Sequence, residues 1–278
     1  MSRDTLKRLL AFRAVGPHHV NPPIEVNRTV ACYKRAKELM IAPSSNDLPP
    51  FEVEIFRVPF GSTTVDVECW LGSLVATFFE RQYYLERDGV SISPRQGDIV
   101  IDAGACFGDT ALAFATNVGS EGMVHSFEPM ASQRAFYERN RERNPGLADV
   151  LRIYDYVLDK VSDDVVHFSN GGAGARPVRD GGGIEIKTIT IDDFVQRFSL
   201  ARVDFIKMDI EGAESHALTG ASDTIRRFRP RLAISAYHSL DDLVELASKI
   251  SEIERSYRPY LVHHSMHSEE TVLYRYAE

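Results

Sequence analysis

The chain has 278 residues, of which 44% are hydrophobic and 26% are charged. These proportions are typical of an ordinary globular protein that can bury a full core. The formal net charge of −8 repels polyanions, so we expect no nucleic-acid partner.

Cysteine usage and hydropathy indicate the compartment. Cys32, Cys69 and Cys106 are widely spaced and form no C-x-x-C pair, so neither a disulfide framework nor a zinc site is indicated. The N-terminal apolar run is too short for a signal peptide, and no stretch approaches the roughly 18 apolar residues of a membrane span. The sequence therefore predicts a cytoplasmic protein without a membrane span.

The first 95 residues differ in pattern from the rest. They show two helical patterns separated by a proline-rich turn, then alternating segments around Gly61 and Ser62 that predict a β-hairpin, then a helical pattern with an aromatic face. The predicted ranges are 6–15, 29–40, 51–60 paired with 63–71, and 73–87. We expect residues 1–95 to form an appendage that contributes to a substrate pocket or to an oligomer contact; a homo-oligomer is left open.

From Gly97 onward, short apolar strands alternate with amphipathic helices, which predicts a Rossmann-like α/β domain with a mostly parallel sheet. The last two strands follow one another without a helix, so the last strand is expected to be antiparallel. The predicted strands are 98–104, 123–129, 150–158, 203–209, 231–237, 259–265 and 270–277. The predicted helices are 108–118, 131–143, 190–198, 214–227 and 240–255. Residues 96–278 form this domain, and the glycine-rich segment 161–187 is expected to be a mobile loop or the disordered tip of a hairpin.

A cofactor site is predicted at the end of the first strand of this domain. The strand ends at Asp102 and turns through Gly104 and Gly108 into a helix, and glycines let the backbone approach a ligand there. The next strand ends at Glu128, whose carboxylate can accept two hydrogen bonds from ribose hydroxyls. Together these features indicate a nucleoside-binding half-domain, against the alternative that the glycines only form a tight turn.

Asp102 bears on which cofactor is bound. A carboxylate before the first glycine would repel a pyrophosphate, whereas it is favourable near a sulfonium and an ammonium group. This favours S-adenosylmethionine over NAD. An NAD-dependent oxidoreductase remains the alternative enzyme, and a non-catalytic protein that retains the fold is the alternative from another class.

Acidic residues gather where the fourth strand ends. Asp209, Glu211 and Glu214 lie within six residues at the carboxyl edge of the sheet, and His238 follows the next strand. We expect Asp209, Glu211 and His238 to form one catalytic unit that assists deprotonation of an acceptor hydroxyl, as bases or as a metal site. The alternative is helix capping, which is favoured for Glu214. Three further histidines lie near the turn at the end of the following strand, and the spacing does not show which of them reaches the site: His263, His264 and His267.

The sequence resembles a known family. The blocks IDAGACFGDTALAFA, VHSFEPMA, TIDDF and VDFIKMDIEGAE, which span about residues 95 to 220, are similar to those of the FkbM family of S-adenosylmethionine-dependent O-methyltransferases. The resemblance implies a class I methyltransferase sheet. It also implies that Asp102 and the Gly104–Gly108 turn, including Ala105, lie against the methionine part of the cofactor, that Glu128 binds the ribose, and that Asp155 contacts the adenine amine.

A looser resemblance links D-I-E-G-A-E-S to TylF-like sugar O-methyltransferases, which hold magnesium with acidic residues at this strand end. Magnesium bound by Asp209, Glu211 and His238 is therefore kept open. The expected function is transfer of a methyl group to a hydroxyl of a small molecule. Sugars or glycosides are the leading acceptor class, and polyketide-type hydroxyls come next.

Overall fold

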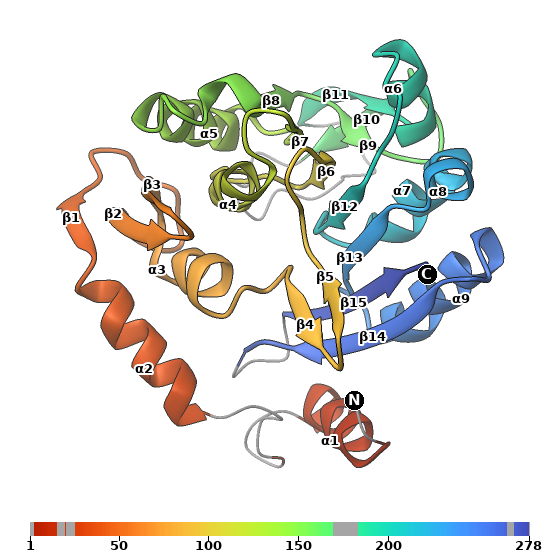
Figure 1. Ribbon diagram of the computed structural model, residues 1–278, viewed down its shortest axis with the longest axis horizontal. Helices are drawn as coiled ribbons and strands as arrows, with labels where there is room; N and C mark the ends of the chain where they lie inside the picture. Colours follow the sequence, from red (N-terminus) through yellow and green to blue (C-terminus); the bar gives the residue numbers. More distant parts are fainter. Residues whose placement is uncertain (1–2, 16–19, 21–25, 169–182, 266–269, 278) are drawn as a thin grey trace.

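The computed structural model describes residues 3–15, 20, 26–168, 183–265 and 270–277 (Figure 1). At its centre is a seven-stranded sheet whose strands we number as they occur along the chain. They are β6 (Ile99–Ala103), β7 (Met123–Phe127), β8 (Leu151–Tyr154), β12 (Phe205–Met208), β13 (Arg231–Ser235), β14 (Arg258–His263) and β15 (Thr271–Tyr276). Their order in the sheet is β14-β15-β13-β12-β6-β7-β8, and β15 runs antiparallel to both of its neighbours. The expected Rossmann-like α/β fold with an antiparallel last strand is confirmed.

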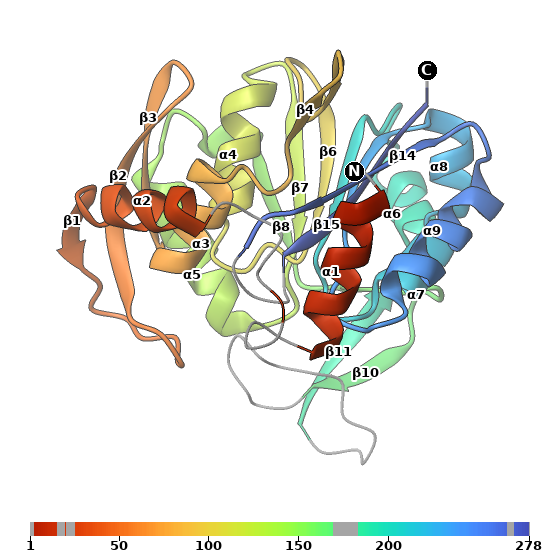
Figure 2. The same cartoon turned by 90° about the horizontal axis from the view of Figure 1, so that it is seen from below.

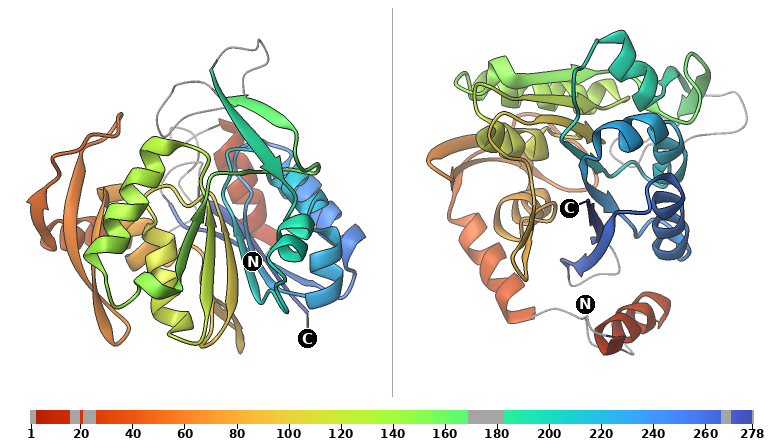
Figure 3. Two further views of the ribbon diagram at one scale, coloured as in Figure 1. Left: turned by 90° about the horizontal axis from the view of Figure 1, so that it is seen from above. Right: turned by 45° about the vertical axis from the view of Figure 1, so that its right-hand side comes forward.

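Helices cover both faces of the sheet, because successive strand residues point to opposite sides. Val100 packs on the face covered by the first two helices of the domain, and its neighbour Ile101 packs on the other face. The first pair comprises α4 (Asp109–Val118) and α5 (Ala131–Arg143). The second face carries α6 (Ile191–Arg197), α7 (Glu214–Thr219), α8 (Ser222–Phe228) and α9 (Asp242–Ile253) (Figures 1 and 3).

The helix predicted over 214–227 is wrong as a single element, because it is divided into α7 and α8. The Asp192 carboxylate accepts hydrogen bonds from the backbone N–H groups of Asp223 and Thr224, at 3.0 and 2.7 Å, and so starts a second helix. In return, the Gly220 carbonyl accepts from the Asp192 N–H. A helix cap supplied by a residue about 30 positions away is not visible in local periodicity.

The N-terminal residues form several small elements. They are α1 (Arg3–Val15), α2 (Val26–Lys37), β1 (Met40–Pro43), β2 (Val53–Phe60), β3 (Thr63–Trp70), α3 (Leu71–Leu74), a π-helical turn at Val75–Phe79, β4 (Leu85–Arg87) and β5 (Val90–Ile92). The hairpin predicted around Gly61 and Ser62 is confirmed as β2–β3. The helix predicted over 73–87 is wrong beyond Phe79: Arg81 adopts a positive φ of 51°, and β4 pairs with β5.

The segment 161–187 is framed by strands. A hairpin of β10 (Val165–Phe168) and β11 (Ile184–Ile189) projects from the body of the protein (Figure 2), and β11 also pairs in parallel with β9 (Val157–Leu158). The expectation of a loop throughout 161–187 is therefore wrong at both ends. Its glycine-rich centre, 169–182, lies outside the described residues.

No helix in the described part of the chain combines the length and apolarity needed to cross a bilayer.

A buried polar network joins the N-terminal sheet to α5. The Glu68 side chain on β3 is fully buried, and its carboxylate accepts from Arg139 at 2.9 Å and from Ser44 at 2.5 Å. The amide of Asn140 bonds both backbone groups of Glu68, at 2.6 and 2.9 Å, and donates to the Phe107 carbonyl at 2.8 Å. The appendage, α5 and the turn after β6 are thus fixed to one another.

We predict that Asn140→Ala lowers the free energy of unfolding by about 2 to 4 kcal/mol, because it leaves several buried backbone groups without partners. Urea denaturation measures the change. Glu142→Ala, at an exposed position on the same helix, is the matched control and should shift stability by less than about 0.5 kcal/mol. Equal stability of the two variants would contradict the role given to Asn140.

Candidate active site

A cavity of about 1210 Å³ opens at the carboxyl ends of β6, β7 and β12, where parallel α/β sheets place their ligands. Its volume exceeds that of a typical single-ligand pocket, which is roughly 300 to 1,000 Å³, so it has room for two ligands. Residues from the sheet edge that line it include Gly104, Ala105, Cys106, Glu128, Lys207, Asp209 and Glu211. Its other walls come from α2, from residues 50–54, from the segment after β3 and from the β10–β11 hairpin.

The glycines of the turn after β6 allow two close approaches within the protein. Gly104 has φ +81°, and a Cβ there would lie 1.9 Å from the Asp209 carbonyl oxygen. Gly108 has φ +79°, and a Cβ there would lie 2.6 Å from the Tyr137 ring. Gly104 and Ala105 line the cavity. Gly108 does not line it and is the residue directly before α4.

Glu128 lies where the sequence places it, directly after β7, and it lines the cavity. Its carboxylate accepts hydrogen bonds from the backbone N–H groups of Cys106 and Met130, both at 3.0 Å. Burial raises the pKa of Glu128 to about 7. A buried carboxylate fixed by two backbone donors at the edge of a cavity is suited to accept further hydrogen bonds from a polyhydroxyl ligand.

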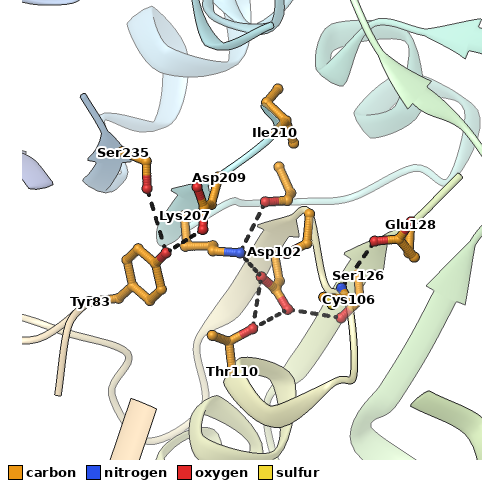
Figure 4. A network of polar contacts seen from close by, with 12 residues as sticks. Tyr83, Asp102, Cys106, Thr110, Ser126, Glu128, Lys207, Asp209, Ile210 and Ser235 are labelled. Atoms are coloured by element: carbon orange, nitrogen blue, oxygen red, sulfur yellow. Dashed lines mark hydrogen bonds and ion pairs between the residues drawn. The ribbon is translucent and has the colours of Figure 1, made fainter. Parts of the chain in front are cut away.

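Asp102 differs from its expected position, because it lies beneath the cavity and does not line it. Its side chain is fully buried. It accepts from Thr110 Oγ1 at 3.1 Å and Ser126 Oγ at 3.4 Å, and it lies 3.2 Å from Lys207 Nζ (Figure 4). The carboxylate therefore forms a buried ion pair within the protein and does not line the cavity.

Lys207, on β12, is a residue that the sequence analysis missed. Its ammonium donates to the Gly104 carbonyl at 2.6 Å and to the Ala103 carbonyl at 3.2 Å, and it lies 5.1 Å from the centroid of the Tyr83 ring. Burial opposes its charge, but the carboxylates of Asp102 and Asp209 outweigh burial and raise the pKa of Lys207. The sequence did contain a signal for this buried ion pair. Lys207 is the one lysine in an otherwise apolar strand, and the neighbouring strand contains Asp102.

We predict that Lys207→Met destabilises the fold by about 3 to 5 kcal/mol, because Asp102 is left buried without its counter-ion. Denaturant unfolding measures this change. The double variant Lys207→Met/Asp102→Asn should regain about half of the loss, since the unpaired charge is then absent. If the double variant is as unstable as the sum of the single variants, the ion pair is not the cause.

Asp209 follows β12 and is held by two tyrosines. Tyr83 donates to Oδ2 and Tyr237 donates to Oδ1, each at 2.8 Å. His238 Nε2 lies 3.5 Å from Oδ1. Burial opposes the negative charge, but Lys207, His238 and the tyrosines outweigh burial and lower the pKa of Asp209. Asp209 is thus an ionised carboxylate at the cavity wall, and its two tyrosine partners were not identified from the sequence.

The second carboxylate beside His238 is Glu214. Glu214 Oε1 lies 3.1 Å from His238 Nδ1 and also accepts from the Ile210 N–H at 2.8 Å. Glu214 is the first residue of α7, where the capping alternative places it, but the N–H group that it binds precedes the helix, so this hydrogen bond fixes the preceding turn and does not cap α7. Glu211 is exposed, has a positive φ of 57° and lines the cavity, whereas His238 does not line it. The structure therefore brings Asp209 and His238 together as expected, with Glu214 in the place expected for Glu211.

The contacts within this group do not suit magnesium. Ligand atoms of Asp209, Glu214 and His238 lie within 4.8 Å of one another. However, the His238 ring lies between the two carboxylates, which raise the pKa of His238 to about 9 despite its burial. A protonated imidazole is positively charged and cannot ligate a metal, and magnesium prefers oxygen ligands. The magnesium site that the sequence analysis kept open is not supported.

We predict a pH-dependent stability from His238. Burial lowers the pKa of His238, but Glu214 and Asp209 outweigh burial and raise it to about 9. Because the folded-state pKa lies above the unfolded value of about 6.5, the stabilisation is complete below pH 6.5 and is lost between pH 6.5 and 9. The expected loss is about 2 to 3 kcal/mol across this range. Urea unfolding from pH 6 to 10 tests it, and His238→Gln should remove this part of the slope.

The other predicted residues fall in different places. Asp155 follows β8, is exposed and does not line the cavity. His264 lines the cavity; its Nε2 lies 2.9 Å from the Tyr274 hydroxyl, and burial lowers its pKa to about 3. His263 is buried and bonds Thr271, and its ring contacts Phe12 of α1. His267 lies outside the described residues.

The strand order, the glycine turn after β6 and the acidic residue after β7 define the fold of class I S-adenosylmethionine-dependent methyltransferases. The family described as "Methyltransferase FkbM domain" matches residues 102–264. The chain belongs to this family. A crystal structure of methyltransferase FkbM from Methylobacillus flagellatus is similar in fold, with a TM-score of 0.57 and 20% identity, and the match covers 95% of this chain and 65% of that one.

Three relatives are similar in sequence. The 2-O-methyltransferase NoeI of Sinorhizobium fredii is 26% identical, covering 52% of this chain and 66% of the relative. The hexuronic acid methyltransferase AglP of Haloferax volcanii is 26% identical, and the match covers 58% of this chain and 64% of the relative. The 31-O-demethyl-FK506 methyltransferase FkbM of Streptomyces tacrolimicus is 27% identical, and the match covers 68% of this chain and 83% of the relative. The matches to the first two relatives thus span just under two thirds of those proteins.

Proposed function

We propose that this protein transfers a methyl group from S-adenosylmethionine to a hydroxyl oxygen of a small molecule, with sugars or glycosides as the leading acceptor class. The observation that carries the proposal is one cavity lined jointly by the turn after β6, by Glu128 and by Asp209. The family and the names of the relatives support it, since two act at oxygen by name and one acts on a hexuronic acid by name. Residues 1–95 and the β10–β11 hairpin would supply the acceptor side.

The residues at the sheet edge fit such a methyl donor. Glu128 can accept hydrogen bonds from ribose hydroxyls, and Gly104 and Ala105 line the same cavity. Asp209 and Glu211 add negative charge at the cavity wall, which suits a cationic sulfonium compound. When bound, S-adenosylmethionine supplies an electrophilic methyl group.

Asp209 is the residue we propose to act on the acceptor. A hydroxyl is a weak nucleophile at neutral pH, so a carboxylate that accepts its hydrogen bond both orients the oxygen and draws the proton away as the bond forms. Tyr83, Tyr237 and His238 act through Asp209 as positioning residues, because they fix both of its oxygens. Glu211 lines the same wall and is proposed to contact the acceptor as well.

Binding and turnover separate this function from its alternatives. Calorimetry with S-adenosylhomocysteine and with NADH distinguishes a methyltransferase from an NAD-dependent oxidoreductase. Release of S-adenosylhomocysteine with a panel of sugars, glycosides and macrolide alcohols then tests turnover. Binding of NADH alone would contradict the proposal. Binding of S-adenosylhomocysteine without turnover on any acceptor would favour a non-catalytic protein that retains the fold.

We predict that Glu128→Gln weakens S-adenosylhomocysteine binding by about 1.5 to 3 kcal/mol, because a charged acceptor of hydroxyl hydrogen bonds is lost. Calorimetry measures the dissociation constant. Glutamine retains one acceptor oxygen, and the melting temperature reports any loosening of the turn. Glu138→Gln, on α5 and outside the cavity, is the control. An unchanged dissociation constant would remove Glu128 from the cofactor site.

We predict that Asp209→Asn lowers kcat by about a hundredfold and leaves S-adenosylhomocysteine affinity within a few-fold, because its carboxylate acts mainly on the acceptor. His238→Gln should lower kcat less, since it acts through Asp209. EDTA should leave turnover unchanged, because a protonated His238 beside Asp209 and Glu214 disfavours a bound cation there. Near-normal turnover of Asp209→Asn, or magnesium-dependent recovery after EDTA, would contradict this account.

A further inference from the structure

An aromatic wall of the cavity lies on the N-terminal elements. Trp70 ends β3 and lines the cavity together with Phe51. The Trp70 ring makes edge contacts with Phe51 and Phe107, with centroids 5.2 and 5.1 Å apart, and its Nε1 donates to the Leu48 carbonyl at 2.9 Å. Phe107 belongs to the turn after β6, so this wall adjoins the proposed methyl-donor end of the cavity.

An aromatic wall beside polar groups is suited to a sugar. The face of an indole or phenyl ring carries partial negative charge, and the C–H groups of a pyranose carry partial positive charge, so the two pack together. Because Trp70 is fixed by three contacts, it offers this surface with little loss of side-chain freedom on binding. Phe51, whose side chain is 63% exposed, extends the surface outward.

Carboxylates line the same cavity as the aromatic wall. The same cavity is lined by four glutamates from the N-terminal elements and the β14–β15 turn: Glu52, Glu54, Glu80 and Glu270. Two cations lie near them, since Lys37 also lines the cavity and Arg28 lies 3.6 Å from Glu80. Gln82 donates to Glu270. Carboxylates therefore outnumber cations on the acceptor side.

The same imbalance holds for the whole cavity. Among the described residues that line it, nine are aspartate or glutamate, two are lysine and none is arginine. Burial raises the pKa of Glu128 to about 7, so this residue carries only part of its charge at neutral pH. A bound S-adenosylmethionine has one net positive charge and offsets one carboxylate. An anionic acceptor would enter a strongly repulsive field, and the described wall offers no guanidinium to bind it.

We propose that the acceptor is a sugar without anionic groups, either uncharged or amino-bearing, that packs on Trp70 and Phe51, and that the surrounding glutamates exclude uronic acids and sugar phosphates. This inference rests on the proposed function, because it specifies the acceptor of the same site. It separates this protein from a hexuronic acid methyltransferase.

The test measures binding to the full-length protein saturated with S-adenosylhomocysteine. Ligand-observed NMR titrations with methyl glucopyranoside, its 2-amino-2-deoxy analogue and methyl glucuronide compare three charges on one ring. We expect the uncharged and amino glycosides to bind at least tenfold more tightly than the glucuronide. This difference should shrink as salt is raised, because salt screens the repulsion.

Variants of residues that line the cavity test whether these residues cause the discrimination against the glucuronide. Glu52→Gln/Glu54→Gln should reduce the discrimination against glucuronide at least threefold, while Glu86→Gln, at an exposed position outside the cavity, should not. Phe51→Ala should weaken uncharged glycoside binding about fivefold. Leu240→Ala, whose side chain is 70% exposed outside the cavity, is its control.

The outcomes are decisive. Glucuronide binding that equals or exceeds binding of the uncharged glycoside would overturn the inference, as would the absence of binding by both non-anionic glycosides. If the expected charge order is found but no acceptor gives S-adenosylhomocysteine release, the proposed function fails while the charge selectivity of the cavity stands.

Discussion

The ion pair between Lys207 and Asp102 is the interaction on which the site depends. It joins the two central strands, β12 and β6, below the cavity, and the same ammonium binds the Ala103 and Gly104 carbonyls that begin the turn. The turn positions the Cys106 N–H that holds Glu128, and the charge of Lys207 supports an ionised Asp209. One buried cation thus links the proposed cofactor side to the proposed acceptor side.

The buried charge of Lys207 requires compensating contacts at fixed positions, because a buried ion without them is strongly destabilising. Both the N-terminal elements and the α/β domain supply these contacts. Tyr83, from the N-terminal elements, lies over the Lys207 ammonium and donates to Asp209. Asn140 ties β3 to the carbonyl of Phe107. The N-terminal elements therefore help to form the site and also enclose it.

Much of this architecture could be predicted from the sequence, because apolar strands, glycine turns and amphipathic helices have local periodicity. Glu128 and Asp209 were found because each directly follows a buried strand. Tyr83, Tyr237 and the pairing of His238 with Glu214 were not found, since these contacts depend on how distant segments pack. Asp102 was placed toward a ligand because a sequence shows where a strand ends but not which buried cation lies beside it.

The cavity wall is divided between two parts of the chain, and this division determines where substitutions are tolerated. The residues proposed to hold the methyl donor directly follow β6 and β7, close to the buried ion pair of the central sheet. Much of the opposite wall is carried by segments that precede the first strand of the sheet, including exposed positions such as Phe51. Substitutions at such exposed positions are therefore expected to change the proposed acceptor wall with little effect on the stability of the central sheet.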